Sequence, residues 1–509
     1  MKCKMWNVVL GAALAIGASF PAGAQSVAVR VTIDTSKPGP QIDRHIFGQF
    51  AEHLGHGIYG GIWVGEGSTI PNIQGYRKDV LDALRAIHVP AIRWPGGCFG
   101  DLYDWRDGIG PRSKRPVRIN VHWGGVTEDN SFGTHEFMNF SELLGADAYV
   151  SLNVGSKSPY DDAQWLEYMT SNENASLANE RRHNGRDKPW RVAMVGIGNE
   201  TWGCGGQMRA EYAADVNRRY SEFANTPPEM GTLKIASGSH DDNFDFAETM
   251  MRDGGRLDGL SVHYYTVPRV FRDKGPALGF PESEWASTLQ HARHIDEIVS
   301  KTSAIMDKYD PQKRVGLYVD EWGTWYDPAP GSNPGFLVQQ NSLRDAEVAA
   351  LSLNIFQRHS DRVRGANIAQ MINVLQAMIM TDGPKMVLTP TYHVFHMYQA
   401  FMDATPYPAT TDSSDYVAGV PMVDVSAARG KDGKIYLALV NTDPTKRVHL
   451  VTNLTGAAHG RILTGAAMDS HNSFDAPNVV HPVSFNGNND EGKISFDLPP
   501  RSIAVVSLN

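Results

Sequence analysis

The sequence predicts a (β/α)₈ TIM barrel followed by an all-β, jelly-roll-like sandwich. Between about residues 45 and 400, eight short apolar, β-branched runs alternate with segments of helical periodicity, a pattern typical of βαβ units that close into a barrel. After residue 400 the helical periodicity stops, and short strand-like runs are separated by turns rich in Gly, Asn and Asp. The 41% of hydrophobic and 20% of charged residues exclude a disordered chain.

The first 24 residues have the pattern of a cleavable signal peptide. Lys2 and Lys4 precede the uncharged apolar run Val8–Phe20, and residues 22–24 (Ala-Gly-Ala) offer a small-residue cleavage site. The apolar run is shorter than the ~20 residues that a membrane-spanning helix needs. We therefore expect an exported protein, periplasmic or secreted, without membrane insertion.

The rest of the chain is predicted to form an N-terminal strand, a barrel and a sandwich. The stretch Val27–Ile33 alternates in polarity, so we expect residues 25–43 to join the sandwich. Residues 44–400 are predicted to form the catalytic barrel and residues 401–509 the sandwich. The barrel strands are expected at His45–Glu52, Ala91–Gly96, Ala148–Gly155, Val192–Glu200, Leu233–Ser239, Gly259–Tyr265, Arg314–Glu321 and Ala366–Val374. Apolar residues recurring every three or four positions predict helices at Tyr76–Ile87, Asp296–Tyr309 and Ala346–Arg358.

Charge and cysteine content narrow the candidate partners. The 47 Lys and Arg against 56 Asp and Glu give a net charge of −9, and no basic block is present, so nucleic acid and anionic membranes are poor candidates. Without the signal peptide only Cys98 and Cys204 would remain, and neither they nor the histidines have zinc-site spacing. We expect no metal and no cofactor.

The fourth and the seventh of the predicted barrel strands each end in a glutamate. The fourth strand ends in Asn199-Glu200, and the seventh in Glu321 followed by Trp322. Active sites of such barrels lie at the C-terminal ends of the strands, where strands three positions apart face each other across about 14 Å. Inward-reaching side chains would leave the carboxyl groups about 6 Å apart, whereas retaining glycosidases need about 5–5.5 Å and inverting ones about 6.5–9.5 Å. The estimate is nearer the retaining value but leaves both mechanisms open.

Seven segments in order along about 330 residues carry a resemblance to a known family. They are Phe47–Gly55, Tyr59–Ile62, Arg93–Phe99, Gly198–Gly206, Ser261–Tyr265, Asp320–Trp322 and Ala369–Leu375. In these segments the chain resembles the α-L-arabinofuranosidases of glycoside hydrolase family 51, which also carry a C-terminal β-sandwich. The combination is highly specific.

The resemblance implies a role for each site residue. Glu321 would be the nucleophile and Glu200 the general acid and then base. Arg93 would keep Glu321 ionised, although a structural ion pair is the equal alternative, and His263 would be either a supporting residue or a core histidine. The implied substrate-binding residues are Glu52, Cys98, Asn199, Tyr265, Gln370 and Trp322.

The implied activity is that of a retaining exo-glycosidase. It would remove terminal non-reducing α-L-arabinofuranosyl residues from arabinan, arabinoxylan or arabino-oligosaccharides, and the resemblance also implies a homo-oligomer, with a hexamer as one candidate. An endoglucanase or a β-xylosidase on the same fold is the alternative enzyme. An inactive sugar-binding protein is the alternative class, and the presence of Glu200 and Glu321 in intact motifs argues against it.

The two remaining cysteines suggest a disulfide. Cys98 lies just past the second predicted strand and Cys204 four residues past Glu200, so both are expected at the mouth of the barrel. Because nearby thiols tend to pair in an oxidising compartment, one hypothesis is a disulfide that braces the loop carrying Glu200. The other is a pair of buried thiols that act as small apolar side chains, with Cys98 touching the sugar.

Overall fold

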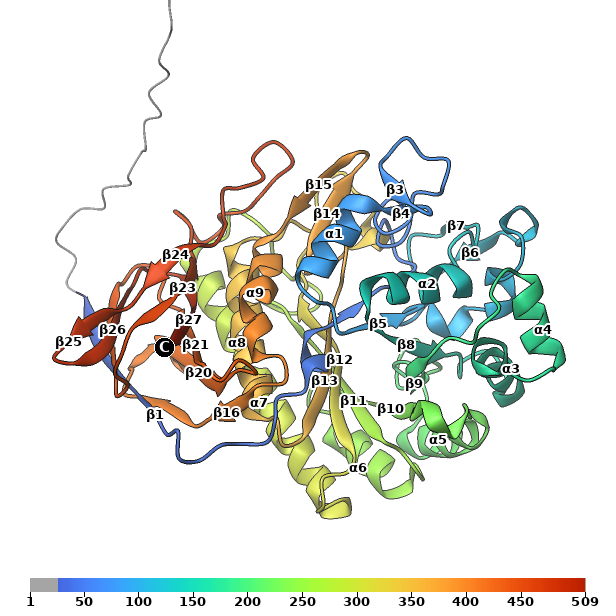
Figure 1. The fold of residues 1–509 in the computed structure, drawn as a ribbon, viewed down its shortest axis with the longest axis horizontal. Coiled ribbons are helices and arrows are strands. Elements are labelled where there is room, and N and C mark those ends of the chain that lie inside the picture. The colour runs from blue at the N-terminus through green and yellow to red at the C-terminus, as the bar shows by residue number, and fades with distance from the viewer. Residues whose placement is uncertain (1–25, 509) are drawn as a thin grey trace, which may run out of the picture.

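The computed structural model describes residues 26–508, in which a closed barrel and a β-sandwich lie side by side (Figure 1). The barrel has the strand order β10-β11-β12-β13-β2-β5-β8-β9, and all neighbouring pairs are parallel. The predicted fold class is therefore confirmed. The predicted signal peptide, residues 1–24, lies outside the described residues.

Every barrel strand overlaps the run that predicts it. The eighth strand begins and ends earlier than expected, because the chain leaves the sheet at Ala369 and turns, with Asn373 and Leu375 in the left-handed region of backbone conformation. The strands are β2 (Gly48–Phe50), β5 (Ala91–Trp94), β8 (Asp147–Leu152), β9 (Val192–Ile197), β10 (Leu233–His240), β11 (Gly259–Thr266), β12 (Gly316–Thr324) and β13 (Val363–Ile368).

Helices cover the outside of the barrel. The first of them buries Val80, Leu81 and Leu84 on the face that the periodicity predicts, and α7 begins earlier than the predicted helix at Asp296. Within residues 26–508 the helices are α1 (Lys78–Ala86), α2 (Thr134–Leu144), α3 (Pro159–Thr170), α4 (Ser176–His183), α5 (Ala210–Phe223), α6 (Phe244–Asp253), α7 (Glu282–Tyr309), α8 (Leu343–Arg358) and α9 (Pro390–Tyr398). Over that range none of them combines the length and the apolar character that crossing a lipid bilayer requires.

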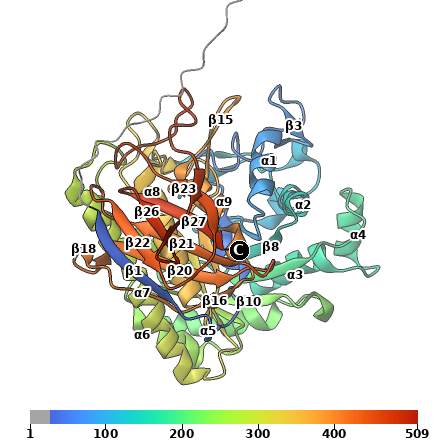
Figure 2. The same cartoon turned by 60° about the vertical axis from the view of Figure 1, so that its left-hand side comes forward.

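The sandwich consists of two packed sheets and includes the N-terminal strand. In Figure 2 the blue strand β1 runs beside the red and orange strands of the C-terminal domain; it pairs in parallel with β22 and antiparallel with β17. Alternate residues of β1, among them Val29 and Val31, enter the apolar core between the sheets. One sheet holds β17 (Ala409–Thr411), β1 (Val27–Ile33), β22 (Val448–Thr452), β26 (Lys493–Leu498) and β25 (Asn488–Asp490). The other holds β16 (Thr405–Tyr407), β20 (Val423–Arg429), β21 (Ile435–Asn441), β27 (Ser502–Leu508), β23 (Ala458–Leu463) and β24 (Val483–Asn486).

Four two-stranded hairpins complete the strands. They lie outside the barrel and the two sheets. The hairpins are β3 (Asn72–Ile73) with β4 (Tyr76–Arg77), β6 (Arg118–Asn120) with β7 (Val126–Glu128), β14 (Ile379–Asp382) with β15 (Lys385–Leu388), and β18 (Asp415–Val417) with β19 (Val420–Pro421).

Helix α8 joins the two domains. It starts at a capping box formed by Ser342 and Asp345, and it packs between β12 of the barrel and β20, β21 and β27 of the sandwich. Its polar residues meet partners across the interface: Asp424 of β20 accepts hydrogen bonds from Asn354 at 2.7 Å and from Arg358 at 3.2 Å. Charged contacts of this kind fix the register of the two domains because a buried charge without its partner is costly.

Glu347 of α8 lies in this interface without such a partner. Its side chain is fully buried, and within residues 26–508 neither carboxyl oxygen has a hydrogen-bond partner. Burial raises the pKa of Glu347 well above its usual range, and the positive charge of Arg501 offsets only part of that rise. The folded protein therefore holds this carboxyl in its neutral form.

We predict that Glu347→Gln makes the protein less sensitive to alkaline pH. Because the pKa of Glu347 is raised in the folded state, its unfavourable contribution is absent below about pH 4.5 and grows by ~1.4 kcal/mol per pH unit above that, up to the folded-state pKa. In thermal unfolding at pH 5, 6.5 and 8, the Tm of the variant minus that of the wild type should increase as the pH rises. Glu211→Gln, at an exposed site of α5, is the control. A Tm difference that is the same at all three pH values would contradict the prediction.

Candidate active site

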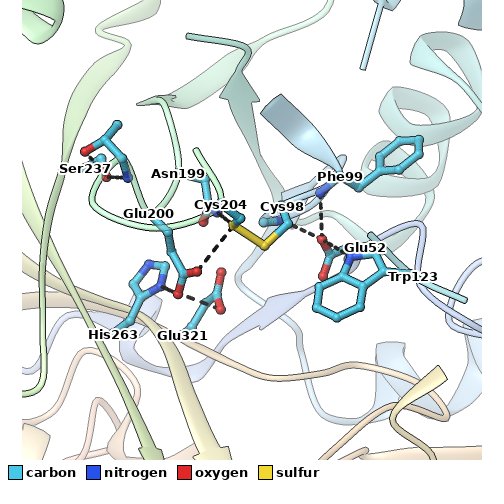
Figure 3. Close-up of a disulfide and its surroundings, with 12 residues drawn as sticks. Glu52, Cys98, Phe99, Trp123, Asn199, Glu200, Cys204, Ser237, His263 and Glu321 are labelled. Carbon is cyan, nitrogen blue, oxygen red and sulfur yellow. Dashed lines mark hydrogen bonds and ion pairs between the residues drawn. A yellow bond between two sulfur atoms is a disulfide. The ribbon is translucent and has the colours of Figure 1, made fainter. Parts of the chain in front are cut away.

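Side chains from six of the eight strand ends converge at the carboxyl end of the barrel. Figure 3 shows Glu200, His263 and Glu321 pointing toward one another on one side of a disulfide, and Glu52 with Trp123 on the other side. The strands or the residues directly after them supply Glu52 (β2), Arg93 (β5), Asn199 and Glu200 (β9), His263 and Tyr265 (β11), Glu321 (β12) and Gln370 (β13), while β8 contributes Gly155 to a contact at the rim. All of these predicted residues are brought into one site.

Glu321 is held by three groups from other strands. Arg93 donates from Nη1 to Oε1 of Glu321 at 2.8 Å and from Nη2 to Oδ1 of Asn199 at 2.6 Å. The hydroxyl of Tyr265 donates to Oε2 of Glu321 at 2.8 Å. Burial by itself would raise the pKa of Glu321, but the positive charges of His263 and Arg93, together with the hydrogen bonds from Arg93 and Tyr265, outweigh it and lower that pKa. Glu321 is therefore ionised.

A β-bulge in β12 turns Glu321 into the barrel. The pairing with β11 joins Val262 to Val319 and then His263 to Glu321, so Asp320 is the extra residue. Asp320 accepts hydrogen bonds from the Tyr149 hydroxyl at 2.6 Å and from Asn367 at 3.0 Å inside the barrel. Two consecutive carboxyl side chains thus face inward.

The same bulge turns Trp322, a predicted substrate-binding residue, away from the other site residues. The residue after an inward-facing one points outward in a strand, and the Trp322 indole packs against Phe356 of α8 and Phe395 of α9. Its exposed fraction is 2%. Trp322 is part of the layer between the barrel and its helices.

Glu200 faces Glu321 across His263. The ring nitrogen Nδ1 of His263 lies 2.9 Å from Oε1 of Glu200 and 3.6 Å from Oε2 of Glu321. One carboxyl oxygen of each glutamate and a ring nitrogen of His263 all lie within 4.8 Å of one another. Burial would lower the pKa of His263, but the charge of Glu321 and the hydrogen bond to Glu200 outweigh it and raise that pKa. His263 therefore contacts both carboxyls, and their charge favours its protonated form.

Glu52 is anchored by four hydrogen-bond donors. Its Oε1 accepts from the backbone amides of Gly97 at 2.9 Å and Phe99 at 3.1 Å and from the Trp123 indole at 2.9 Å. Its Oε2 accepts from the Gln370 side chain at 3.0 Å. Burial and the nearby negative charge of Glu321 nevertheless raise the pKa of Glu52 to about 7, against the lowering effect of those hydrogen bonds and of Arg93.

Glycines allow these groups to approach one another. A Cβ on Gly96 would lie 2.7 Å from Cγ of Glu52, and one on Gly97 would lie 2.9 Å from Oε1 of Glu321. Both distances are shorter than packed atoms allow, so the segment after β5 needs residues without side chains at both positions. Since Gly97 also donates to Glu52, it connects the two sides of the site.

The predicted disulfide between Cys98 and Cys204 is confirmed. The two Cα atoms are 5.5 Å apart and the sulfur atoms are bonded. Sγ of Cys204 lies 3.5 Å from Oε2 of Glu200, so the bond both fixes the loop that carries Glu200 and forms part of the wall of the site. Cys98 therefore has no thiol to offer a ligand.

The donor set does not suit a metal ion. Glu200, His263 and Glu321 are close enough to bind a cation together, but Arg93 already lies at 2.8 Å from Glu321 and would repel it. The second group with metal-like spacing consists of Cys98, Glu200 and Cys204, and disulfide sulfurs lack the thiolate charge that a metal site needs. The carboxyls are instead satisfied by cationic and hydrogen-bonding side chains of the protein.

Three residues near the site escape prediction from the sequence. Trp123, in the turn of the β6–β7 hairpin, donates to Glu52. Trp325, just after β12, packs edge-on against Tyr265 with ring centroids 5.1 Å apart. Asp101, three residues after Cys98, is buried beside the Glu200 loop. Trp123 precedes Gly124-Gly125, a turn signal inside a long loop, which is the only local pattern that points to any of them.

The chain is similar to known proteins over nearly its whole length. Residues 83–278 match the family described as "Alpha-L-arabinofuranosidase 1 domain", and residues 320–502 match "Alpha-L-arabinofuranosidase C-terminal domain". A Bacteroides ovatus protein named "Intracellular exo-alpha-L-arabinofuranosidase" is 47% identical over 503 residues, covering 97% of this chain and 98% of the relative.

Two solved structures resemble this one closely. The GH51 arabinofuranosidase from Xanthomonas axonopodis pv. citri superposes with a TM-score of 0.93 at 54% identity, covering 95% of this chain and 100% of the other. The arabinose complex of the α-L-arabinofuranosidase from Thermotoga maritima superposes with a TM-score of 0.84 at 29% identity, covering 94% of this chain and 99% of the other.

The Bacteroides ovatus relative contradicts the predicted export. It matches over 97% of this chain and is named an intracellular enzyme. The expectation of a periplasmic or secreted protein, which depended on the pattern of residues 1–24, is therefore wrong.

Proposed function

Because the chain belongs to the α-L-arabinofuranosidases of glycoside hydrolase family 51, we propose that it cleaves terminal, non-reducing α-L-arabinofuranosyl residues from arabinan, arabinoxylan or arabino-oligosaccharides with retention of configuration. The hydrolase activity itself follows from the family. The observation that carries the mechanism is the distance of at most 4.8 Å between carboxyl oxygens of Glu200 and Glu321. Retaining glycosidases need about 5–5.5 Å between these groups, whereas inverting ones leave room for a water.

Glu321 is the nucleophile in this proposal. Its lowered pKa keeps the carboxylate ionised, and an ionised carboxylate can attack the anomeric carbon to form a glycosyl-enzyme ester. Tyr265 and Arg93 each hold one oxygen of Glu321, so the carboxylate is oriented before the sugar binds. Preorganisation of this kind lowers the barrier because the groups need not rearrange in the transition state.

Glu200 is the acid and then the base. It gives its proton to the leaving oxygen while Glu321 attacks, and it then takes a proton from the water that hydrolyses the ester. His263, at 2.9 Å from Oε1 of Glu200 and 3.6 Å from Glu321, supports both steps because it responds to the charge of either carboxylate. The disulfide beside Oε2 of Glu200 limits the directions in which this carboxyl can move.

The remaining predicted residues bind the furanose ring. Asn199, oriented by Arg93 at 2.6 Å, is placed for the hydroxyl next to the anomeric carbon, where contacts strengthen in the oxocarbenium-like transition state. Glu52 and Gln370 share a hydrogen bond of 3.0 Å and face the other hydroxyls. Cys98 contributes disulfide sulfur to the wall and not a thiol hydrogen bond.

A homo-oligomer, with a hexamer as one candidate, is part of the proposal. The family resemblance is its main support. The β6–β7 hairpin adds an exposed apolar surface, since Val117, Ile119 and Val121 are 61%, 57% and 64% exposed, and exposed apolar patches of this kind commonly mark contacts between proteins.

A panel of three substrates tests the specificity. We expect hydrolysis of an aryl α-L-arabinofuranoside to exceed that of an aryl β-D-xyloside at least about 100-fold in kcat/KM, with no release of sugar from β-glucan, because buried polar groups that hydrogen-bond one sugar are left unpaired by another. Equal rates on the xyloside, or chain cleavage of the glucan, would instead support the alternative β-xylosidase or endoglucanase.

Removal of the nucleophile should be rescued by a small anion. We predict that Glu321→Ala lowers kcat at least about 10⁴-fold on every arabinofuranoside and that azide restores part of the rate with an inverted glycosyl azide as product, because azide can occupy the space of the lost carboxylate. Asp320→Asn is the matched control, since Asp320 is the adjacent buried carboxyl of the same strand, and azide should not change its rate. A Glu321→Ala enzyme that gives no azide product would contradict the assignment.

Removal of the acid should depend on the leaving group. Glu200→Ala is expected to lower kcat/KM about 10²–10⁴-fold for a sugar or alkyl leaving group, which needs a proton, and far less for a nitrophenyl leaving group, which does not. Parallel assays of the two substrate types on Glu200→Ala and Glu321→Ala measure this difference. The role given to Glu200 is rejected if kcat/KM of Glu200→Ala falls by the same factor on both types of substrate.

A further inference from the structure

Asp101 is a buried carboxyl beside the site that the proposed mechanism does not use. It lies in the short 3₁₀ helix Gly100–Leu102, directly after the segment that carries Cys98. Its exposed fraction is 3%. A buried carboxyl in a loop is costly unless its contacts compensate, so its neighbours indicate what it does.

One side of Asp101 is fixed to the end of β8. The backbone amide of Gly155 donates to Oδ1 at 3.1 Å, and the hydroxyl of Ser156 donates to the Asp101 carbonyl at 2.7 Å. Gly155 has no room for a side chain, because a Cβ there would lie 2.9 Å from Cβ of Asp101. The 3₁₀ helix is thereby seated on the barrel.

The other side of Asp101 contacts the segment that carries the acid. Oδ2 of Asp101 is buried on this side and has no hydrogen-bond partner within residues 26–508. A Cβ on Gly205 would lie 2.9 Å from Oδ2 of Asp101 and 1.9 Å from the Asn199 carbonyl oxygen. The carboxyl therefore fills the space between the end of β8 and both ends of the segment Asn199–Gly205.

The conformation of Glu200 depends on that segment. The carbonyl of Glu200 accepts from the amides of Gly203 at 2.7 Å and Gly205 at 3.1 Å, and the residue itself has a φ of 38°, a conformation that a side chain of this size rarely adopts. A shift of Gly205 would therefore be transmitted to the Glu200 backbone. The disulfide holds the same segment at Cys204.

We propose that Asp101 is a positioning residue. By packing between the segment Asn199–Gly205 and the end of β8, its carboxyl keeps Asn199 and Glu200 in the positions that catalysis requires. The proposal depends on the proposed role of Glu200 as acid and base. The loop after β5 then holds the segment Asn199–Gly205 at two points, by a covalent bond from Cys98 and by the carboxyl of Asp101.

The electrostatic surroundings of Asp101 favour the neutral form of its carboxyl. Burial raises the pKa of Asp101 to about 8, and the charge of Glu200 adds to the rise, while the hydrogen bond from Gly155, the charge of Arg93 and the nearby backbone of Asn199 lower it. Below that pH the carboxyl is uncharged and adds no further negative charge beside Glu200. An amide of the same shape should therefore replace it.

The test compares Asp101→Ala with Asp101→Asn in the full chain. Each variant is assayed on a nitrophenyl α-L-arabinofuranoside and on the methyl α-L-arabinofuranoside, with folding checked by thermal unfolding. We expect Asp101→Ala to lower kcat/KM at least about tenfold on the methyl glycoside and less than about threefold on the nitrophenyl glycoside, because a displaced acid matters only for a leaving group that needs a proton. Asp101→Asn should restore the methyl glycoside rate to within about threefold of the wild type.

Asp162→Ala is the matched control. Asp162 has the same exposed fraction of 3%, and its carboxyl accepts from the Asn153 amide at 3.3 Å, just after β8 and away from the segment Asn199–Gly205. It should change both substrates by the same factor. If Asp101→Ala does not fold, Asp101→Ser carries the test.

Three results would overturn the proposal. In the first, Asp101→Ala lowers kcat/KM by the same factor on the methyl and the nitrophenyl glycoside. In the second, Asp101→Asn fails to restore kcat/KM on the methyl glycoside. In the third, Asp162→Ala shows the same dependence on the leaving group as Asp101→Ala. Failure of the proposed function has a different signature, since Glu200→Ala itself would then show no leaving-group dependence. In that case the role of Asp101 is rejected together with the role of Glu200.

Discussion

The arrangement of the site depends on the hydrogen bonds and the positive charge of Arg93. Three carboxyls, those of Glu52, Glu200 and Glu321, occupy one largely buried space, and burial together with the negative charge of Glu321 raises the pKa of Glu52 to about 7. The guanidinium of Arg93 lowers the pKa of both Glu52 and Glu321 and donates directly to Glu321 and Asn199. Without this cation a buried carboxylate would lose its compensation, which costs about 3–5 kcal/mol when one partner of a buried pair is removed.

The sequence predicts the parts of the site that follow from strand geometry. Parallel barrel strands are buried on both faces, so an ionisable residue where an apolar run stops is conspicuous, and this pattern identifies Glu200 and Glu321. Arg93, His263 and Tyr265 also lie on barrel strands. The pairing of Arg93 with Glu321 is among the predictions, but the contact of His263 with both glutamates is not, because it depends on which side chains meet across the barrel.

The failures have a physical cause in each case. Trp322 directly follows the glutamate that ends a predicted strand, but the extra residue Asp320 shifts the alternation, and the indole packs outside the barrel. Trp123 and Asp101 lie in the long segment between β5 and α2, which has neither helical nor strand periodicity over most of its length. Such loops are positioned by tertiary contacts, and their contribution to a site is not visible in local patterns.

The disulfide is one of several contacts by which the segment after β5 holds the parts of the site together. Its prediction started from export, which the Bacteroides ovatus relative contradicts, yet the bond is present because two loops meet, with Cα atoms 5.5 Å apart. Three residues of the segment from Arg93 to Asp101 contact three different strand ends or the loops that follow them. Gly97 reaches Glu52, Cys98 reaches Cys204, and Asp101 reaches Gly155. A single loop therefore fixes the nucleophile side, the acid side and the sugar-binding side relative to one another, and a substitution within it should be judged by which of these strand ends it releases.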